Sequence, residues 1–513
     1  MQAISQYPRT TMDKLIYSSV HALAAVVGVG LLCILSKVIY NIYFHPLSKF
    51  PGPKWAAASN LFYVFGWTGG RWAFTVEALH KKYGPVVRFA PNDLDFSTVE
   101  SYQDIYGTAT KGRKQFLKGE WYNQGPGGTR SLVMSNERDP VRHREARKLL
   151  APAFSSSALR AQTAFVLKYV DMWIEQIRKH GDTDGGINIE EWFNWLTFDI
   201  IGDLAFGESF GAVENAKGHE WVPAIKRGIA EGQLTDVFRR VPFLRYFPWA
   251  VRGQRVPTNR LANTKRSRDL VERRMKSGSE RADFFSHIVK SEELDLSLAY
   301  LTGQANMLVI AGSETVATAL AGTTYYLLHT PQALNRLSEE VRSSFTTCKD
   351  INGDTTQSLP YLNAVISEGL RIFPPVPAGL PRISSGDPIS GYAVPAGTSV
   401  STSFWTTTRS ASYFASPRSF CPERWLDHDH PFWEERFADD VKDASRPFSI
   451  GPRACIGLGL AELELRIVLA RVVWGFDLEG VNGTEELDWV GRVTMRLLWE
   501  KPALWVRFRE VVR

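Results

Sequence analysis

The stretch that decides the fold lies near the C-terminus and reads Pro447-Phe448-Ser449-Ile450-Gly451-Pro452-Arg453-Ala454-Cys455-Ile456-Gly457. It is a loop rich in Pro and Gly that runs directly into a helical segment, residues 458–474. A Cys at the start of a helix lies near unpaired backbone N–H groups and the positive end of the helix dipole, and both favour its thiolate. Because a thiolate binds a metal or attacks an electrophile, Cys455 is a candidate ligand or nucleophile, although a lone Cys is more often a buried structural residue.

The residues around Cys455 favour a role beyond packing. Gly451 and Gly457 allow the backbone to approach a flat ligand closely, and Arg453 offers a fixed cation to an acidic group. The residues Phe, Gly, Arg, Cys and Gly stand at offsets 0, 3, 5, 7 and 9. Such a pattern arises by chance in on the order of one chain in ten thousand at average residue usage.

This loop resembles the heme-binding loop of the cytochrome P450 family, in which the Cys is the proximal thiolate ligand of the iron. By position, the resemblance assigns Cys455 to the iron, Phe448 to shielding of the sulfur and Arg453 to a heme propionate. A thiolate opposite dioxygen pushes electron density toward the iron and favours O–O cleavage. The resemblance therefore implies heme b as cofactor and a mainly α fold with small β-sheets. In that fold the heme lies between a long central helix and the helix that follows the Cys loop.

The composition restricts the class of protein. The chain has 513 residues, of which 44% are hydrophobic and 12% aromatic, and this describes a globular protein with a large core. Its four cysteines are dispersed without CxxC or zinc spacing, which argues against a disulfide framework and a zinc site and favours a reducing compartment. A net charge of +6 suits either nucleic acid or an anionic membrane surface.

The N-terminal segment predicts a membrane anchor. Between Lys14 and Lys37 the 22 residues carry no charge when His21 is neutral. As a helix they span about 33 Å, enough for a hydrocarbon core of roughly 30 Å. A cleaved signal peptide is the weaker alternative, because the run is long and bulky basic sequence follows it without a small-residue cleavage site.

The Pro-rich stretch at residues 45–54 is predicted to be a stiff, extended hinge, and its form resembles that of fungal members of the family. The predicted organisation is an anchor region at residues 1–37, a hinge at 38–60 and a catalytic domain at 61–513. The resemblance implies a single-pass protein of the endoplasmic reticulum membrane with its catalytic domain in the cytosol.

A second informative stretch, residues 296–330, carries one charged residue, Glu314, when His329 is neutral. Its small and polar residues predict a buried central helix and not a second membrane span. A single buried acid is costly unless it has a function or a partner. The Thr315 hydroxyl can bond to a carbonyl one turn earlier and bend the helix, which leaves a notch lined by a hydroxyl and a carboxylate. This arrangement resembles the family's oxygen-binding motif, which implies that Thr315 holds the activated oxygen and its waters and that Glu314 admits protons from bulk solvent.

Other segments match the family in order. His143 and Arg147 lie four residues apart on one predicted helix face. The resemblance makes both of them heme-propionate partners, together with Arg382. It also predicts a buried charge network under the heme that is architectural and not catalytic, formed by Glu368, Arg371 and Arg424.

Two further segments concern the substrate and lipid. Residues 111–130 are rich in Gly and predict a mobile loop, and the corresponding family loop caps the substrate. Residues 238–276 interleave basic and aromatic side chains, which suits single-stranded nucleic acid or an interfacial segment on anionic lipid. With an anchor already predicted, membrane lipid is favoured and no nucleic-acid partner is expected. A solvated basic face remains the alternative.

Together these motifs predict a heme-thiolate monooxygenase that inserts one oxygen atom from O2 into an apolar small molecule by hydroxylation, epoxidation or oxidative ring modification. No GxGxxG, P-loop or flavin signature occurs. Electrons are therefore expected from NADPH through a separate NADPH-cytochrome P450 reductase, with cytochrome b5 as a second donor. The fungal-type hinge suggests tailoring of a polyketide, terpenoid or alkaloid in secondary metabolism.

Two alternatives stay open at this point. One is a heme-thiolate isomerase, dehydratase or peroxygenase that needs no external electrons, and the other is a non-catalytic heme carrier or sensor. The retained pair Glu314 and Thr315 argues against both, because neither class needs a proton relay.

Overall fold

The computed structural model describes residues 9–110, 112–123, 133–246, 259–277, 283–284 and 297–512, without the side chains of 9–15, 224–231, 259–264 and 485. Its α-helices are α1 (Arg9–Ile39), α2 (Lys54–Ala58), α3 (Leu61–Thr68), α4 (Trp72–Tyr83), α5 (Val99–Tyr106), α6 (Pro140–Leu150), α7 (Ser156–His180), α8 (Ile189–Phe206), α9 (Trp221–Arg240), α10 (Asn259–Lys276), α12 (Leu298–Leu328), α13 (Pro331–Ser344), α14 (Pro360–Ile372), α15 (Phe404–Thr407), α16 (Leu458–Gly475) and α17 (Trp489–Arg492). Its strands are β1 (Val86–Ala90), β2 (Asp93–Phe96), β3 (Leu117–Lys118), β4 (Ile187–Asn188), β5 (Arg382–Ile383), β6 (Ser399–Thr402), β7 (Phe476–Gly480), β8 (Thr494–Met495), β9 (Trp499–Glu500) and β10 (Trp505–Glu510). The predicted class, mainly α with small sheets, is confirmed.

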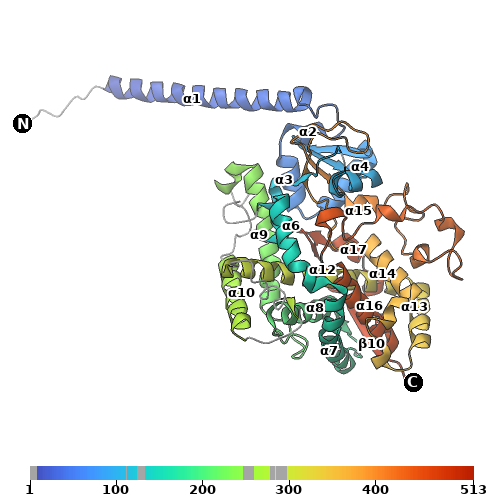
Figure 1. Cartoon of the computed structure of the whole chain (residues 1–513). Coiled ribbons are helices and arrows are strands. Elements are labelled where there is room, and N and C mark those ends of the chain that lie inside the picture. Colours follow the sequence, from blue (N-terminus) through green and yellow to red (C-terminus); the bar gives the residue numbers. More distant parts are fainter. Residues whose placement is uncertain are drawn as a thin grey trace, which may run out of the picture.

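Helix α12 runs through the middle of the molecule (Figure 1). It begins where the Ser297 side chain accepts the Tyr300 N–H (3.3 Å), and it ends before Pro331, which begins α13. The helix packs against α8, α10, α14 and α16. Its most apolar window is 72% buried, so the prediction of a central core helix is confirmed over that of a second membrane span.

The largest sheet joins segments that are distant in the sequence. Strands β1 and β2 form an antiparallel pair around Pro91 and Asn92, and β2 then pairs in parallel with β6. The strand order is β1-β2-β6-β5-β3. Because β5 and β3 are antiparallel neighbours, Lys118 lies directly opposite Arg382.

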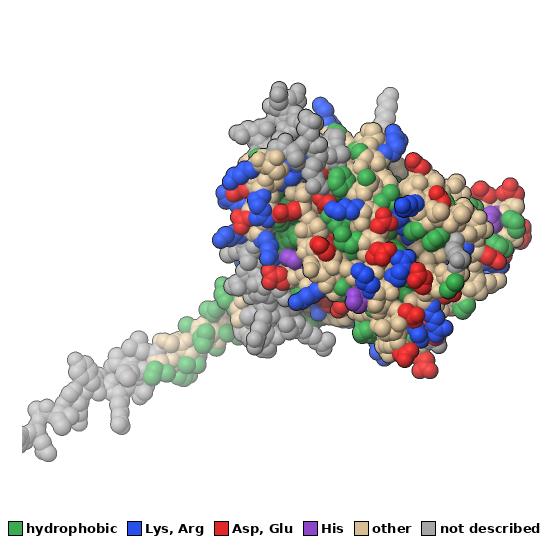
Figure 2. All heavy atoms as spheres, turned by 90° about the horizontal axis from the view of Figure 1, so that it is seen from below, with side chains coloured by type: hydrophobic (Ala, Val, Ile, Leu, Met, Phe, Trp, Pro, Cys, Tyr) green, Lys and Arg blue, Asp and Glu red, His purple; other side chains and the backbone are tan. Residues whose placement is uncertain are grey.

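Helix α1 projects away from the globular part (Figure 1), and Figure 2 shows hydrophobic side chains along its described length. The span Ile16–Phe44 has a mean hydropathy of 2.4, and none of its most apolar window is buried. Its last residues form a short π-helix, η1 (Tyr40–Phe44). By length and composition this segment is able to cross a membrane, as an anchor or as a signal sequence.

The predicted hinge differs from the structure. Residues 45–50 are not helical, as expected, but they fold into turns and do not form an extended spacer. Leu47 and Phe50 are buried in a core cluster with the first sheet, and the Arg88 N–H donates to the Pro51 carbonyl (2.7 Å). Burial of these apolar side chains attaches the segment to the globular part, which proline content alone does not predict.

Candidate active site

Cys455 lies between the 3-10 turn η13 (Gly451–Arg453) and the first turn of α16. Its backbone N–H donates to the Phe448 carbonyl (2.9 Å), which closes the loop on itself. Its side chain is exposed, although protein atoms surround it closely enough for burial to dominate its pKa. The thiol is therefore accessible although protein surrounds most of it.

The sequence led us to expect a Cys455 thiolate, but the structure favours the protonated thiol. Burial raises the pKa of the thiol, and the Gly457 N–H and the Arg147 charge, which both lower it, offset this only in part. The helix start alone thus does not produce a thiolate. A bound metal cation deprotonates a coordinating thiol outright, and the N–H of Gly457 then stabilises the negative sulfur.

A strip along the central helix is also accessible. Ala311 is exposed, and Gly303, Met307 and Thr315 are partly exposed, along a helix in which most residues from 301 to 325 are buried. These residues recur every fourth position and therefore share one helix face. The Thr315 hydroxyl donates to the Ala311 carbonyl (2.5 Å), so the predicted bond to the preceding turn is present. Since α16 packs against α12, this strip and the Cys455 thiol belong to neighbouring elements.

Glu314 is buried, with 5% of its surface exposed, and its carboxylate pairs with the ammonium group of Lys501. Lys501 also donates to the Thr318 hydroxyl (2.8 Å), one turn further along α12. The Glu314 carboxylate is therefore directed toward Lys501 and Thr318, whereas the Thr315 hydroxyl is directed back to Ala311. Glu314 was expected to admit protons from bulk solvent, but the structure encloses it in an ion pair.

Five basic side chains form a cationic cradle near the Cys loop: Lys118 of β3, His143 and Arg147 of α6, Arg382 of β5 and Arg453 of η13. Arg147 donates to the Ala454 carbonyl (2.7 Å), and Arg453 donates to the Glu137 and Arg138 carbonyls (2.5 and 3.0 Å). Arg382 donates to the Tyr122 hydroxyl (3.2 Å). The structure thus brings together the four cradle residues that the sequence predicted.

The cradle residues destabilise one another's charge. Burial, followed by Arg382, lowers the pKa of Arg453 to about 10. Burial, followed by Arg382 and Arg453, holds the pKa of Lys118 well below its ordinary value. Burial, followed by Arg453 and Lys118, lowers the pKa of His143 to about 3, so its ring is neutral near pH 7. Like charges placed opposite each other are destabilising, and an anionic ligand relieves this strain.

Sequence reasoning missed Lys118 and Tyr122. Lys118 is buried, and its ammonium group lies 4.4 Å from the centre of the Tyr122 ring and bonds to the Ser135 carbonyl. In the sequence Lys118 is one lysine in a Gly-rich, polar segment, and nothing local marks it as part of the site. Its place in the cradle becomes visible only because β3 pairs with β5, which puts Lys118 opposite Arg382.

The two loop glycines have different surroundings. Gly451 has a φ of +73°, and a Cβ there would lie 2.2 Å from the Tyr106 carbonyl oxygen, so this glycine lets the loop pack on the end of α5. At Gly457 a Cβ would meet only Phe154 (3.9 Å) and the Cys455 sulfur (4.0 Å). Phe448 packs against the main core. Contact of these three residues with a cofactor stays a prediction.

Comparison with known proteins decides the family. A family model described as Cytochrome P450 matches residues 51–505. The chain belongs to the cytochrome P450 family. It is 45% identical over 481 residues to the cytochrome P450 monooxygenase BOA3 of Botryotinia fuckeliana (strain B05.10), and the match covers 92% of each chain.

Two other similar proteins are named as members of the same family. The cytochrome P450 monooxygenase btcC of Colletotrichum orbiculare is 39% identical over 497 residues, which cover 95% of this chain and 94% of the relative. The cytochrome P450 monooxygenase ORF9 of Penicillium roqueforti is 38% identical over 499 residues, with 96% and 95% covered. The chain is thus a cytochrome P450 monooxygenase, which implies heme iron, a small-molecule substrate and a redox partner.

The site of this cytochrome P450 fits a heme. Among the residues that the structure describes, no three His, Cys, Asp or Glu side chains gather into a site for a metal ion. A metal held there by Cys455 needs its remaining ligands from elsewhere, and a porphyrin brings four of them. The cationic cradle offers charge-assisted partners for the two propionates.

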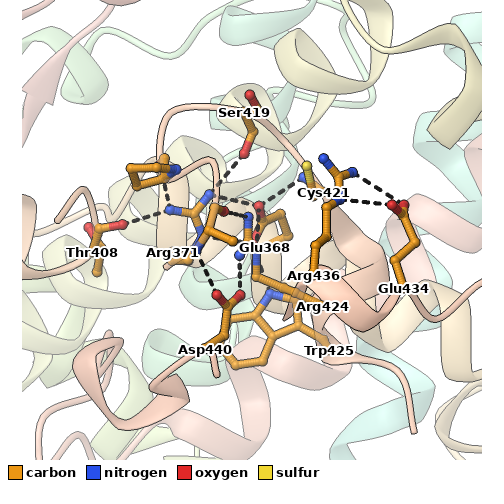
Figure 3. A network of polar contacts seen from close by, with 12 residues as sticks. Glu368, Arg371, Thr408, Ser419, Cys421, Arg424, Trp425, Glu434, Arg436 and Asp440 are labelled. Atoms are coloured by element: carbon orange, nitrogen blue, oxygen red, sulfur yellow. Dashed lines mark hydrogen bonds and ion pairs between the residues drawn. The ribbon is translucent and has the colours of Figure 1, made fainter. Parts of the chain in front are cut away.

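The predicted charge network of the cytochrome P450 is confirmed (Figure 3). Arg371 donates to both oxygens of Glu368 at 2.7 Å, and Arg424 approaches the same carboxylate at 3.2 Å. All three side chains are fully buried. Burial raises the pKa of Glu368, but Arg371 and Arg424 outweigh it and hold that pKa below its ordinary value. Asp440, which the sequence did not indicate, pairs with Arg424. The network connects α14 to the segment that leads to the Cys loop.

The basic-aromatic segment is described only in part, since residues 247–258 lie outside the described ranges. Arg239 and Arg240 have partners inside the globular part, because both pair with the buried Asp236 of α9 and Arg240 also binds Asp93 of β2. Phe243 and Tyr246 are exposed. The predicted substrate-capping loop, residues 111–130, is described at 112–123, where it contains β3 and the 3-10 turn η2 (Glu120–Tyr122), whereas 111 and 124–130 are outside the described ranges.

Proposed function

We propose that this cytochrome P450 monooxygenase uses heme b and receives electrons from NADPH through a separate NADPH-cytochrome P450 reductase, with cytochrome b5 as a second donor. The observation that supports this is the accessible Cys455 thiol at the start of α16, beside a cationic cradle and an accessible strip of α12. The relatives are named as monooxygenases, and nothing among them supports the alternative of an isomerase, dehydratase or peroxygenase.

Each side chain has a proposed role toward the heme. When bound, the heme supplies the iron that activates dioxygen for insertion of one atom into the substrate. Cys455 would ligate the iron, Phe448 would shield its sulfur, and Gly451 and Gly457 would shape the loop around it. The propionate partners would be the cradle residues His143, Arg147, Arg382, Arg453 and Lys118. The low pKa of His143 makes it a neutral N–H donor to a carboxylate.

The distal residues would handle protons. The Thr315 hydroxyl donates to Ala311 in the structure, and this bond is on the accessible face of α12, where the hydroxyl can turn to donate into the site. Glu314 is the adjacent acid and is proposed to supply protons to that hydroxyl. Most α12 residues from 301 to 325 outside the strip are buried, which supports exclusion of bulk water from that side.

The substrate is proposed to be an apolar secondary metabolite of the polyketide, terpenoid or alkaloid class. All three relatives come from fungi, which supports this assignment by analogy alone. The accessible strip of α12 consists of Gly303, Met307, Ala311 and Thr315. Three of these four residues have no polar side-chain group, which suits contact with an apolar substrate.

The test uses full-length protein in lipid vesicles with the reductase, NADPH and oxygen-18 gas. Metabolites of the three classes are first screened for a substrate-induced spin shift of the heme. A ligand that shifts the spectrum is expected to gain one oxygen-18 atom, and only when NADPH is present. Product without the label, or turnover without NADPH, would contradict the proposed reaction.

The membrane placement is also a proposal. Residues 1–37 would anchor the protein in the endoplasmic reticulum membrane, residues 38–60 would connect it, and residues 61–513 would form a cytosolic catalytic domain in contact with membrane lipid. The exposed Trp55, Phe65, Phe243 and Tyr246 support lipid contact beyond the anchor. Deletion of residues 1–37 is expected to reduce sedimentation with membranes while heme content stays the same. Unchanged sedimentation would refute the anchor.

A further inference from the structure

Lys501 follows strand β9, and its side chain is enclosed completely, with 0% exposed. Lysine is almost never fully buried unless it is paired. Here the ammonium group contacts Glu314 and Thr318 of α12 and lies 3.4 Å from a Glu190 oxygen of α8. One lysine therefore joins two buried carboxylates on the two helices that pack most closely in the core.

The three contacts of Lys501 are not equivalent. The Glu314 and Thr318 contacts are within hydrogen-bond distance, whereas 3.4 Å to Glu190 is an ion pair without a good hydrogen bond. Glu190 has its own partners, since Asn194 donates to its side chain (2.8 Å) and it stands in the positive first turn of α8. The ammonium group is thus committed mainly to Glu314.

A contribution to folding stability does not by itself explain why Lys501, Glu314 and Glu190 are charged residues. Apolar replacement of a buried ion pair or triad is often neutral or stabilising, while loss of one partner is costly. The cluster also stands next to Thr315, on the helix that carries the accessible strip. An ammonium group in direct contact keeps a buried carboxylate ionised, because the opposite charge offsets desolvation.

We propose that Lys501 is a positioning residue for the proton-handling pair Glu314 and Thr315. It keeps Glu314 in its carboxylate form and fixes that carboxylate on the Thr318 side of α12. Glu314 is then the ionised acceptor that takes up a proton at one defined oxygen before the proton passes toward the Thr315 hydroxyl. The use of Glu314 as a proton acceptor rests on the proposed function. The effect of Lys501 on the ionisation of Glu314 is testable without turnover.

The first experiment is infrared spectroscopy of the purified holoenzyme at pH 7. Lys501→Met removes the cation but keeps most of the side-chain volume. It is expected to produce a carbonyl stretch of a protonated carboxylic acid in addition to any wild-type band from Glu464, whose pKa burial raises to about 8. The additional band should disappear in the double variant K501M/E314Q. Absence of the band in K501M, or its persistence in the double variant, overturns the proposal, because Glu314 then does not depend on Lys501 for its charge.

A second variant keeps the test valid if K501M does not accumulate as folded protein. K501M/E190Q removes one cation and one carboxylate, so the buried group has the same net charge as in wild type. Glu314 again lacks its ammonium partner and is expected to give the protonated-acid band. A spectrum like that of wild type overturns the proposal here as well.

The second experiment measures the peroxide formed per NADPH consumed, in the reductase-reconstituted holoenzyme without added substrate. Lys501→Met and Glu314→Gln are each expected to raise this ratio, and the double variant is expected to match Glu314→Gln alone. Independent, additive effects would indicate a merely structural lysine. The matched control is Arg274→Met, which breaks the buried Arg274–Asp283 pair of α10 and should leave the ratio per heme unchanged. If wild type shows no NADPH-dependent turnover with any ligand that shifts its spectrum, the proposed function fails, while the infrared result still decides the role of Lys501.

Discussion

His143 makes the stability of the heme-free protein depend on pH in a direction that the structure fixes. Burial, followed by the charges of Arg453 and Lys118, lowers its pKa to about 3 from an ordinary 6.5. Below pH 6.5 the unfolded chain therefore binds a proton at His143, whereas the folded chain does not until about pH 3. The stability that comes from neutral His143 is complete above pH 6.5 and is lost as the pH falls.

The size of this loss follows from the two pKa values. Between pH 6.5 and 3 each pH unit lowers the free energy of unfolding by about 1.4 kcal/mol at this residue. The expected loss between pH 6.5 and pH 5 is roughly 2 kcal/mol. His143→Phe abolishes the titration and should remove that part of the pH dependence, whatever its effect on stability at pH 7.

The assay is urea unfolding of the heme-free protein at both pH values, for wild type and His143→Phe. The heme-bound form provides a second comparison, since two propionates offset the surrounding cations and should weaken the pH dependence. An identical pH dependence in wild type and variant would show that His143 is not held neutral by the cradle.

Three further predictions address other parts of the site. Thr315→Ala should keep its heme but release more peroxide per NADPH consumed, and an unchanged ratio would remove Thr315 from the mechanism. Arg424→Ala should lower the free energy of unfolding by about 3–5 kcal/mol in urea denaturation because it removes the guanidinium partner of the buried Asp440 carboxylate. Arg436→Ala, whose ion pair with a half-exposed glutamate is itself half exposed, should cost less than about 1 kcal/mol, and equal losses would contradict the burial argument. Gly451→Ala should reduce heme incorporation, measured as heme per protein, because its Cβ would collide with a carbonyl at 2.2 Å. Gly475→Ala, where a Cβ meets nothing within 4 Å, is the control, and equal heme content in both variants would refute the packing argument.

The features that the sequence predicted are those encoded locally. The Cys loop carries its own glycines and begins a helix, and α12 shows its buried position through a long run with one acid, Glu314. The Glu368–Arg371 pair is an i, i+3 contact within one helix, so spacing alone indicates it.

The features that the sequence did not predict depend on distant pairing. Lys118 acquires its partner only because β3 lies beside β5, and the parallel pairing of β2 with β6 joins residues about three hundred positions apart in the chain. Lys501 reads as a surface lysine between Glu500 and Pro502, and only the fold places it against Glu314. The ordinary preference of lysine for the surface made this position uninformative.

The pKa of the Cys455 thiol also depends on the fold and not on the local sequence alone. Its place at a helix start is visible in the sequence and favours the thiolate, but burial by the surrounding core has the larger and opposite effect on its pKa. The loop therefore does not present a reactive thiolate on its own, and this supports a metal-ligand role over a nucleophile.

The most direct test of the whole account is the absorption spectrum of the dithionite-reduced protein under carbon monoxide, for wild type and Cys455→Ser. Wild type is expected to show the red-shifted Soret band of a thiolate-ligated heme, and Cys455→Ser is expected to lose it. A wild-type band at the position typical of histidine-ligated heme, or a red-shifted band that survives in Cys455→Ser, would contradict the assignment of Cys455 as the iron ligand.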